Sequence, residues 1–385
     1  MLPLDDIRVL DLSRLAPGPY CSMLLADMGA DVLLIEPPPD ARAGQAGSGA
    51  DVYDALRRNK RSIVLNLRDD AAREVFYKLA MEADVVLEGF RPGVVKRLGV
   101  DHDTLSAKNP RIISCSLSGY GQTGPYAQVV GHDINYISVG GALGMTGWPG
   151  QPPAIPMNVI ADFAGGGLHA AYGILLALHA RERTGRGQYV DIAMSDGVLS
   201  LLTMMVGGYF AGGRAPERGA TVLNGSVPHY NVYECSDGGW ISLGSLEAHF
   251  YANLCKVLEC EHFIPHQYDS SKRDEIFAHF RKQFASKPRD EWFEILKQTD
   301  ICAAPVYSLD EALQDPHNLA RNMVIEIDHD GTPIKQIGIG TKLSETPGRV
   351  RSVSPKPGQQ TDDVLASIGY DSQTIASLRE AGAVA

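Results

Sequence analysis

The chain has 385 residues, which is enough for two or three domains of ordinary size. Hydrophobic residues make up 44% and charged residues 21%, a balance that is typical of globular proteins and excludes a disordered acidic chain. The 46 acidic and 35 basic side chains give a net charge of -11, which argues against nucleic acid or an anionic membrane as the main partner. An anionic ligand would need a local basic cluster.

The cysteines and the start of the chain predict a cytoplasmic protein. The six cysteines are scattered without a CxxC pair, so neither a disulfide framework nor a zinc site is indicated. The first residues, MLPLDDIRVLDL, carry acids where a signal peptide needs lysine or arginine. The longest apolar stretch, near residues 201 to 213, is too short to span a bilayer.

The first part of the chain alternates short β-branched runs with amphipathic stretches, which is the pattern of βαβ units. We expect strands at residues 7–12, 31–36, 62–67, 84–90 and 111–118, and helices at 19–30 and 70–83. The pattern therefore predicts an α/β fold whose large domain holds a Rossmann-like parallel sheet.

Further along, Asp162 precedes an apolar segment with helical spacing, so we expect it to cap a helix of about five turns. A strand at 188–194 and an apolar helix at 198–209 follow. We expect a large domain over 1–211, a linker over 212–224, a smaller α/β domain over 225–325, and a return segment over 326–385 that docks on the large domain.

Two short motifs are weak. Residues 119–124 match GxGxxG after a strand, but Pro125 and a loop follow where a dinucleotide site needs a helix. The segment AMSDG around Ser195 is one residue short of the hydrolase nucleophile elbow, and a turn or helix cap is the favoured interpretation over a thioesterase. The histidines lack metal-ligand spacing, so we expect no metal.

A glycine-flanked loop, GHDINY, places His132 and Asp133 ahead of the helix that begins near Asp162. On spacing alone, an ordinary loop histidine and a capping aspartate remain the favoured interpretation. Basic residues gather at the expected strand ends and would bind phosphate groups. They are Arg42, Arg57, Arg58, Lys60, Arg61, Arg91, Lys96 and Arg97.

Taken together, several segments resemble the family III CoA-transferase superfamily, and within it the α-methylacyl-CoA racemase branch. They are VLDLSRLAPGPYCSMLLADMGADVLLIE, RNKRSIVLNL, LEGFRPGV, SGYGQTGPY, GHDINY, ADFAGGG, RTGRGQYVDIAM and YNVYECSDGGWISLGSLEAHF, and they cover nearly the whole chain. The resemblance implies that His132 and Asp162 are two catalytic bases and that Asp133 and Glu247 support them. It also implies contacts to coenzyme A (CoA) at Arg42, Leu65, Asn66, Leu67, Arg68, Gly89, Phe90, Arg91, Arg97, Gly131 and Tyr136.

The resemblance implies a racemase that inverts the α-carbon of 2-methylacyl-CoA thioesters, with no cofactor beyond CoA as part of the substrate. It also implies an interlocked homodimer. We expect backbone N–H groups near Asp133 and the glycines at 165–167 to stabilise an enolate, and these glycines to let a thioester approach the backbone. Two alternatives stay open: a CoA-transferase that uses Asp162 as a carboxylate nucleophile, and an acyl-CoA-binding protein without turnover.

Overall fold

A computed structural model describes residues 1–39 and 51–385, and in it the chain forms two compact units. Unit 1 contains residues 1–140, 157–202 and 319–385, and unit 2 contains residues 141–156 and 203–318. Residues 141–156 and 203–211, which the sequence pattern put in the large domain, thus group with unit 2, and residues 319–325, which it put in the small domain, group with unit 1.

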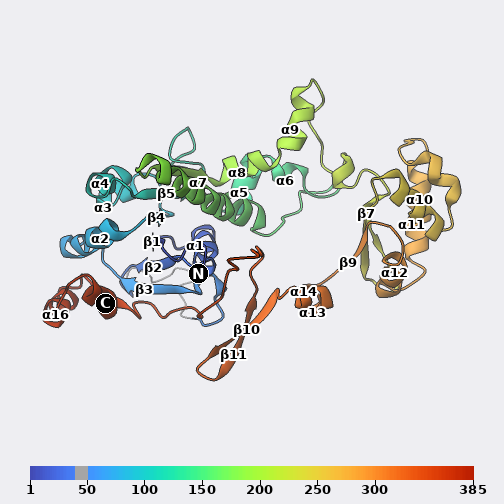
Figure 1. The fold of residues 1–385 in the computed structure, drawn as a ribbon. Coiled ribbons are helices and arrows are strands. Elements are labelled where there is room, and N and C mark those ends of the chain that lie inside the picture. Colours follow the sequence, from blue (N-terminus) through green and yellow to red (C-terminus); the bar gives the residue numbers. More distant parts are fainter. Residues whose placement is uncertain (40–50) are drawn as a thin grey trace. The chain divides into compact units, whose positions relative to one another are not determined.

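Unit 1 is built on a six-stranded parallel sheet (Figure 1). The strands, in sheet order, are β3 (Lys60–Val64), β2 (Asp31–Glu36), β1 (Arg8–Asp11), β4 (Val85–Glu88), β5 (Ile113–Ser118) and β6 (Tyr189–Ala193). This order confirms the predicted Rossmann-like sheet. From β1 the chain adds strands β2 and β3 on one side and β4, β5 and β6 on the other, so the strand order switches sides between β1 and β4. Ligands of such sheets bind at this switch point, beyond the carboxyl ends of the strands.

Helices cover both faces of this sheet. One face carries α1 (Pro17–Asp27) and α7 (His169–Thr184), and the other carries α2 (Asp70–Glu82) with the C-terminal helices α15 (Thr361–Ser367) and α16 (Ser372–Glu380). Phe76 of α2 and Leu365 of α15 lie fully buried in the core of this second face. Among the described residues, unit 1 also contains the α-helices α3 (Val94–Leu98), α4 (His102–Lys108), α5 (Asp133–Val139) and α8 (Met194–Leu201).

The end of the chain returns to unit 1 through a hairpin, β10 (Val324–His329) and β11 (Thr332–Ile337). Val384 forms an antiparallel bridge with Leu65, and the N–H of Asn66 donates to the carbonyl of Ala383 at 2.9 Å. The last residues therefore extend the edge of the sheet next to β3.

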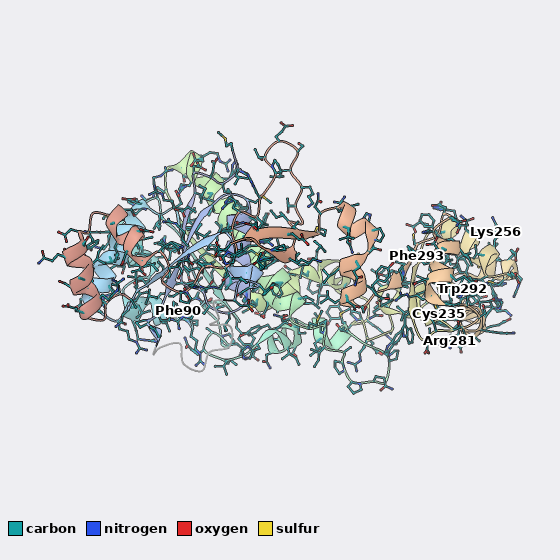
Figure 2. The ribbon with its side chains drawn as sticks, turned by 90° about the horizontal axis from the view of Figure 1, so that it is seen from below. Phe90, Cys235, Lys256, Arg281, Trp292 and Phe293 are labelled. Carbon is teal, nitrogen blue, oxygen red and sulfur yellow. The ribbon has the colours of Figure 1, made fainter. Side chains whose placement is uncertain are left out.

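Unit 2 is a smaller α/β unit. Its antiparallel sheet has the order β7 (Tyr230–Glu234), β8 (Trp240–Gly244) and β9 (Ala303–Val306). The helices are α6 (Ala142–Met145), α9 (Thr203–Phe210), α10 (Ala248–Val257), α11 (Arg273–Phe284), α12 (Arg289–Leu296) and α13 (Leu309–Gln314); α14 (Pro316–Ala320) spans the boundary. Figure 2 labels Cys235 and Trp292, which both lie in its buried core.

Two predicted helices differ from the observed ones. The helix around Asp162 begins earlier, as a π-helical segment at Val159–Leu168 that continues into α7, so Asp162 lies in its first turn and Asn158 is the N-cap. The helix expected at 198–209 is split at Leu202 into α8 and α9. The continuous stretch Val159–Thr184 is long and apolar enough to cross a membrane, but in the structure it packs against α1, α8, β5 and β6.

Candidate active site

Two neighbouring cavities lie at the carboxyl edge of the unit 1 sheet, where its strand order reverses. The first has a volume of 420 Å³ and is lined by the segments that follow β1, β4 and β5 together with the start of α5. The second has a volume of 750 Å³ and is lined by the segments that follow β1, β2, β3 and β4. Arg14 and Phe90 line both cavities, so they form the wall between them.

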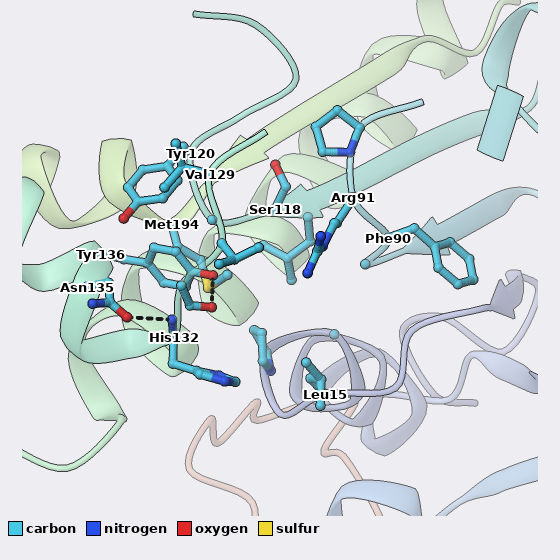
Figure 3. A pocket seen from close by; sticks show the side chains of 18 of the residues that line it. Leu15, Phe90, Arg91, Ser118, Tyr120, Val129, His132, Asn135, Tyr136 and Met194 are labelled. Atoms are coloured by element: carbon cyan, nitrogen blue, oxygen red, sulfur yellow. Dashed lines mark hydrogen bonds between the residues drawn. The ribbon is translucent and has the colours of Figure 1, made fainter. Parts of the chain in front are cut away.

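The first cavity contains most of the predicted catalytic loop (Figure 3). His132 is exposed to this cavity and is the N-cap residue of α5. Its backbone N–H donates to Oδ1 of Asn135 at 3.0 Å, and its carbonyl accepts from the N–H of Asn135 at 2.8 Å. This reciprocal pair fixes the backbone at His132 and leaves the imidazole directed toward the cavity.

Asp133 is buried and binds the start of the neighbouring helix. Its Oδ2 accepts the N–H groups of Ala161 at 2.7 Å and of Asp162 at 2.8 Å. These two donors lie in the first turn of the π-helical segment, where no intrahelical acceptor exists. Asp133 therefore ties the position of Asp162 to the His132 loop. Its other oxygen, Oδ1, is also buried and has no partner in the part of the chain that the structure describes.

Asp162 is half-buried, and its Oδ2 accepts a hydrogen bond from the side-chain amide of Asn158 at 3.1 Å. Burial raises the pKa of the Asp162 carboxyl above its ordinary value, the Asn158 hydrogen bond opposes this, Asp133 adds to the rise, and His132 lowers it. Asp162 does not line the first cavity as described, but it lies close enough to His132 for their charges to interact. A carboxyl and an imidazole are thus held at one site, linked through Asp133.

The ring of Tyr136 packs against Gly119, which follows β5, and against Gly131 of the His132 loop, and it leaves no room for a side chain at either position. A Cβ on Gly119 would lie 2.2 Å from the Tyr136 ring, and one on Gly131 would lie 2.8 Å from it. The Tyr136 hydroxyl donates to the carbonyl of Gly131. Burial raises the pKa of this hydroxyl to about 12, with Tyr120 and Asp162 adding to the rise and Arg91 opposing it. The GxGxxG match at 119–124 is therefore a turn that accommodates an aromatic ring.

The other predicted CoA-contacting residues divide between the two cavities. Leu65, Asn66, Leu67 and Arg68 line the second cavity, Gly89, Arg91, Gly131 and Tyr136 line the first, and Phe90 lines both. Arg97 lines neither, and Arg42 lies outside the described residues. Glu247 belongs to unit 2, where it is the N-cap residue of α10.

The basic cluster at 57–61 is not available for phosphate groups, so that prediction is wrong. Its members precede or begin β3, and each pairs with an acid of unit 1. The pairs are Arg57 with Glu36 at 2.9 Å, Arg58 with Asp27 at 2.6 Å, Lys60 with Asp11 at 3.6 Å and Arg61 with Asp31 at 2.6 Å. The sequence shows the positive charges but not their acidic partners, which lie in earlier segments of the chain, from Asp11 to Glu36.

The glycines at 165–167 also have a different role from the expected one. They are buried inside the helix, where a Cβ on Gly166 would lie 2.8 Å from Cγ of Met194 and one on Gly167 2.6 Å from the carbonyl of Pro17. They allow α1 and α8 to pack closely, so they do not face a thioester. Ser195 is buried in the first turn of α8 behind the N-cap Ala193, so it is neither a cap nor a nucleophile elbow.

Sequence reasoning missed several residues of the site, and three of them make contacts that matter here. Asn158 contacts Asp162, while Ser13 and Arg14 line the first cavity directly after β1. The position of Ser13 and Arg14 at the carboxyl end of a central parallel strand was the available signal, because that edge is where ligands bind in such sheets.

The CoA-transferase family III model matches residues 4–361 of the chain. Alpha-methylacyl-CoA racemase of Mus musculus is 38% identical over 378 residues, covering 97% of this chain and 96% of its own. Succinyl-CoA--D-citramalate CoA-transferase of Chloroflexus aurantiacus is 33% identical, covering 95% and 94%. The crystal structure of a CAIB/BAIF family protein from Brucella suis superposes with a TM-score of 0.81 at 29% identity, covering 95% of this chain and 99% of that one. The chain therefore belongs to CoA-transferase family III, as an enzyme of the superfamily that includes both CoA-transferases and racemases.

Proposed function

We propose that the protein is a racemase of the α-methylacyl-CoA type, which inverts the α-carbon of 2-methylacyl-CoA thioesters. The observation that carries this proposal is that Asp133, the residue next to His132, binds the backbone N–H of Asp162 at 2.8 Å and so holds an imidazole and a carboxyl at one site. Inversion requires one group to remove the α-proton from one face and a second group to deliver a proton to the other face. The identity to a racemase over nearly the whole chain supports the same function.

In this mechanism one proton is shared between the two groups. With Asp162 ionised and His132 protonated, the carboxylate removes the α-proton and the imidazolium protonates the opposite face; turnover in the other direction reverses the roles. The raised pKa of Asp162 brings its basicity closer to that of an imidazole, which favours transfer in both directions.

The intermediate is an enolate whose negative charge lies on the thioester oxygen. The N–H groups of Asp133 and Ile134, in the first turn of α5, have no acceptor within the described residues and are our candidates for stabilising it. The N–H groups at the start of the π-helical segment are weaker candidates, because Asp133 already accepts those of Ala161 and Asp162.

We further propose that CoA enters only as part of the substrate, with its nucleotide end in the second cavity and its thioester in the first. No other cofactor and no metal takes part. The protein would act in the cytoplasm as a homodimer. The outer face of α7, together with Leu168 just before it, supports the dimer because it exposes Leu168, Tyr172, Leu175 and Leu176.

Incubation of one stereoisomer of a 2-methylacyl-CoA with the enzyme in D₂O tests the reaction. We expect α-deuterium in the product together with loss of stereochemical purity, and no need for an acceptor acid. Mass spectrometry and chiral chromatography measure the two quantities. Retention of the α-proton would contradict the proposal.

A CoA-transferase is the second candidate, because an accessible aspartate carboxylate would serve as its nucleophile and transferases are among the relatives. Transfer of CoA to an added carboxylic acid, with a covalent adduct on Asp162, would favour it. A protein that binds acyl-CoA and leaves it unchanged would show neither reaction.

A further inference from the structure

Two buried acids end neighbouring strands at the cavity edge. Asp11 is the last residue of β1 and Glu88 the last residue of β4, and their exposed fractions are 1% and 5%. The strands pair directly, with Asp11 opposite Leu87. Neither acid was among the predicted site residues.

Each acid accepts the backbone N–H two residues further along the chain. Oδ1 of Asp11 accepts the N–H of Ser13 at 2.8 Å, and Oε2 of Glu88 accepts the N–H of Phe90 at 2.7 Å. An aspartate that accepts in this way folds the chain into a tight turn, and Glu88 makes the equivalent bond through a side chain one methylene longer. The same arrangement at two adjacent strand ends therefore shapes two adjacent turns.

These two turns form the wall between the cavities. The guanidinium carbon of Arg14 lies 5.4 Å from the centre of the Phe90 ring, in a cation–π contact that joins one turn to the other. Both residues line both cavities. A Cβ on Gly89 would lie 3.7 Å from Cβ of Ser13, so the turns are also in contact behind this pair.

The two acids are held differently. Asp11 contacts Ser22 and Lys60 and is therefore part of a larger buried network. Glu88 has fewer contacts: besides Phe90, Ser116 of β5 hydrogen-bonds to it, and Asp191 of β6 is its charged neighbour. Burial raises the pKa of the Glu88 carboxyl. A substitution at Glu88 should therefore change the wall between the cavities with less effect on the rest of the core than a substitution at Asp11.

We propose that Glu88 is a positioning residue for CoA thioesters. Its carboxylate accepts the Phe90 N–H and holds the Gly89–Arg91 turn, and this turn keeps Phe90 and Arg14 in place between the two cavities. This inference rests on the proposed function only in taking CoA as the ligand. A glutamine keeps an acceptor oxygen at this position, whereas an alanine leaves the Phe90 N–H without one.

The test measures CoA affinity by calorimetry in the full-length protein, together with hydrogen exchange at the Phe90 amide. We expect Glu88→Ala to weaken CoA binding at least tenfold and to speed exchange at Phe90, and Glu88→Gln to stay within about threefold of the wild type. In steady-state assays the alanine variant should raise KM more than it lowers kcat.

Asp84→Ala is the matched control. Asp84 precedes the opposite end of β4, accepts the N–H of Arg8 at 2.8 Å and pairs with Arg181 at 2.8 Å. We expect this variant to lower stability without changing CoA affinity. Equal affinities for wild type, Glu88→Gln and a folded Glu88→Ala would overturn the positioning role, as would equal losses in both Glu88 variants or a loss in Asp84→Ala. Wild-type CoA binding without racemisation would instead refute only the proposed reaction, and no CoA binding would refute both.

Discussion

The carboxylate of Asp133 is engaged by the backbone, whereas that of Asp162 can act on a substrate. Asp133 accepts the N–H groups of Ala161 and Asp162, while Asp162 accepts from the Asn158 side chain. In the proposed racemase these two acids, adjacent to one histidine, therefore have different roles: one fixes the geometry and the other exchanges a proton.

Replacing Asp162 with asparagine should remove one of the two bases without changing the size of the side chain. We expect racemisation to fall about 10²- to 10⁴-fold, the usual contribution of a positioned general base. Exchange of the α-proton of the stereoisomer that His132 attacks should survive in part. Deuterium incorporation from each stereoisomer separately measures this. Full racemase activity in Asp162→Asn would exclude the two-base assignment.

The pH profile should report the environment of Asp162. Because burial raises its pKa, the carboxyl becomes protonated at a higher pH than an ordinary aspartate. A protonated Asp162 is no longer a base, so kcat/KM for the direction in which it acts as base should fall as pH decreases through this raised pKa. An acidic limb at the ordinary aspartate pKa of about 3.9, with a folded enzyme, would contradict the expectation.

The residues of the site could be predicted only in part, and the reason is the range of their contacts. The resemblance led to His132, Asp133 and Asp162. The hydrogen bonds of Asp133 connect residues 28 and 29 positions apart, and a single sequence does not show such contacts. For the same reason the sequence wrongly predicted phosphate binding by the basic run at 57–61, because the acidic partners of these residues lie in earlier segments.

At the scale of elements, the β-branched runs correctly predicted the strands, and each predicted strand lies within a few residues of an observed one. The sequence did not predict the π-helical segment, because its glycines suit several backbone conformations. Packing against α8 decides which conformation they adopt. A Cβ on Gly197 of α8 would lie 2.0 Å from the carbonyl oxygen of Gly165. The two helices can approach this closely only without side chains at the contact.

Gly197→Ala should therefore destabilise the fold by several kcal/mol, in the upper range of single substitutions, because the new methyl group meets backbone rather than a movable side chain. The midpoint of chemical unfolding measures the effect. Gly207→Ala in α9 is the control, since nothing lies within 4 Å of its added Cβ and alanine favours a helix. Equal stability of the two variants would contradict this account of the glycines.

At the scale of the whole molecule, the two units can be observed separately in the intact chain. All three tryptophans, Trp148, Trp240 and Trp292, belong to unit 2, so tryptophan fluorescence reports on that unit. Unit 2 also contains His229, which is fully buried between the rings of Tyr251 and Tyr268 and whose two ring nitrogens have no hydrogen-bond partner among the described residues.

Burial lowers the pKa of His229 to about 4. The unfolded chain binds a proton at this histidine below its ordinary pKa of about 6.5, so between pH 6.5 and 4 the unfolded state binds more protons and the stability of unit 2 should fall as pH falls. The loss is at most about 3 kcal/mol. His229→Phe should remove this pH dependence of the fluorescence-detected transition, whereas replacement of the exposed His249 should retain it. A wild-type transition independent of pH over this range would refute the assignment.

The outer face of α7 provides a test of the proposed dimer. Leu168, Tyr172, Leu175 and Leu176 recur at helical spacing with exposed fractions of 51%, 59%, 42% and 50%, while Ile174 and Ala177 of the same helix are buried against the sheet. A continuous apolar stripe of this kind is typical of a surface that another protein covers.

If a second copy of the chain covers this stripe, Leu176→Glu places a charge in an apolar interface and should convert the dimer to a monomer of 41.5 kDa in light scattering. Met81→Glu is the matched control, because Met81 is also apolar and 55% exposed but lies on α2, which packs on the other face of the sheet. We expect Met81→Glu to remain dimeric. A wild-type protein that is monomeric at micromolar concentration, or a Leu176→Glu variant that stays dimeric, would show that the stripe does not form the interface.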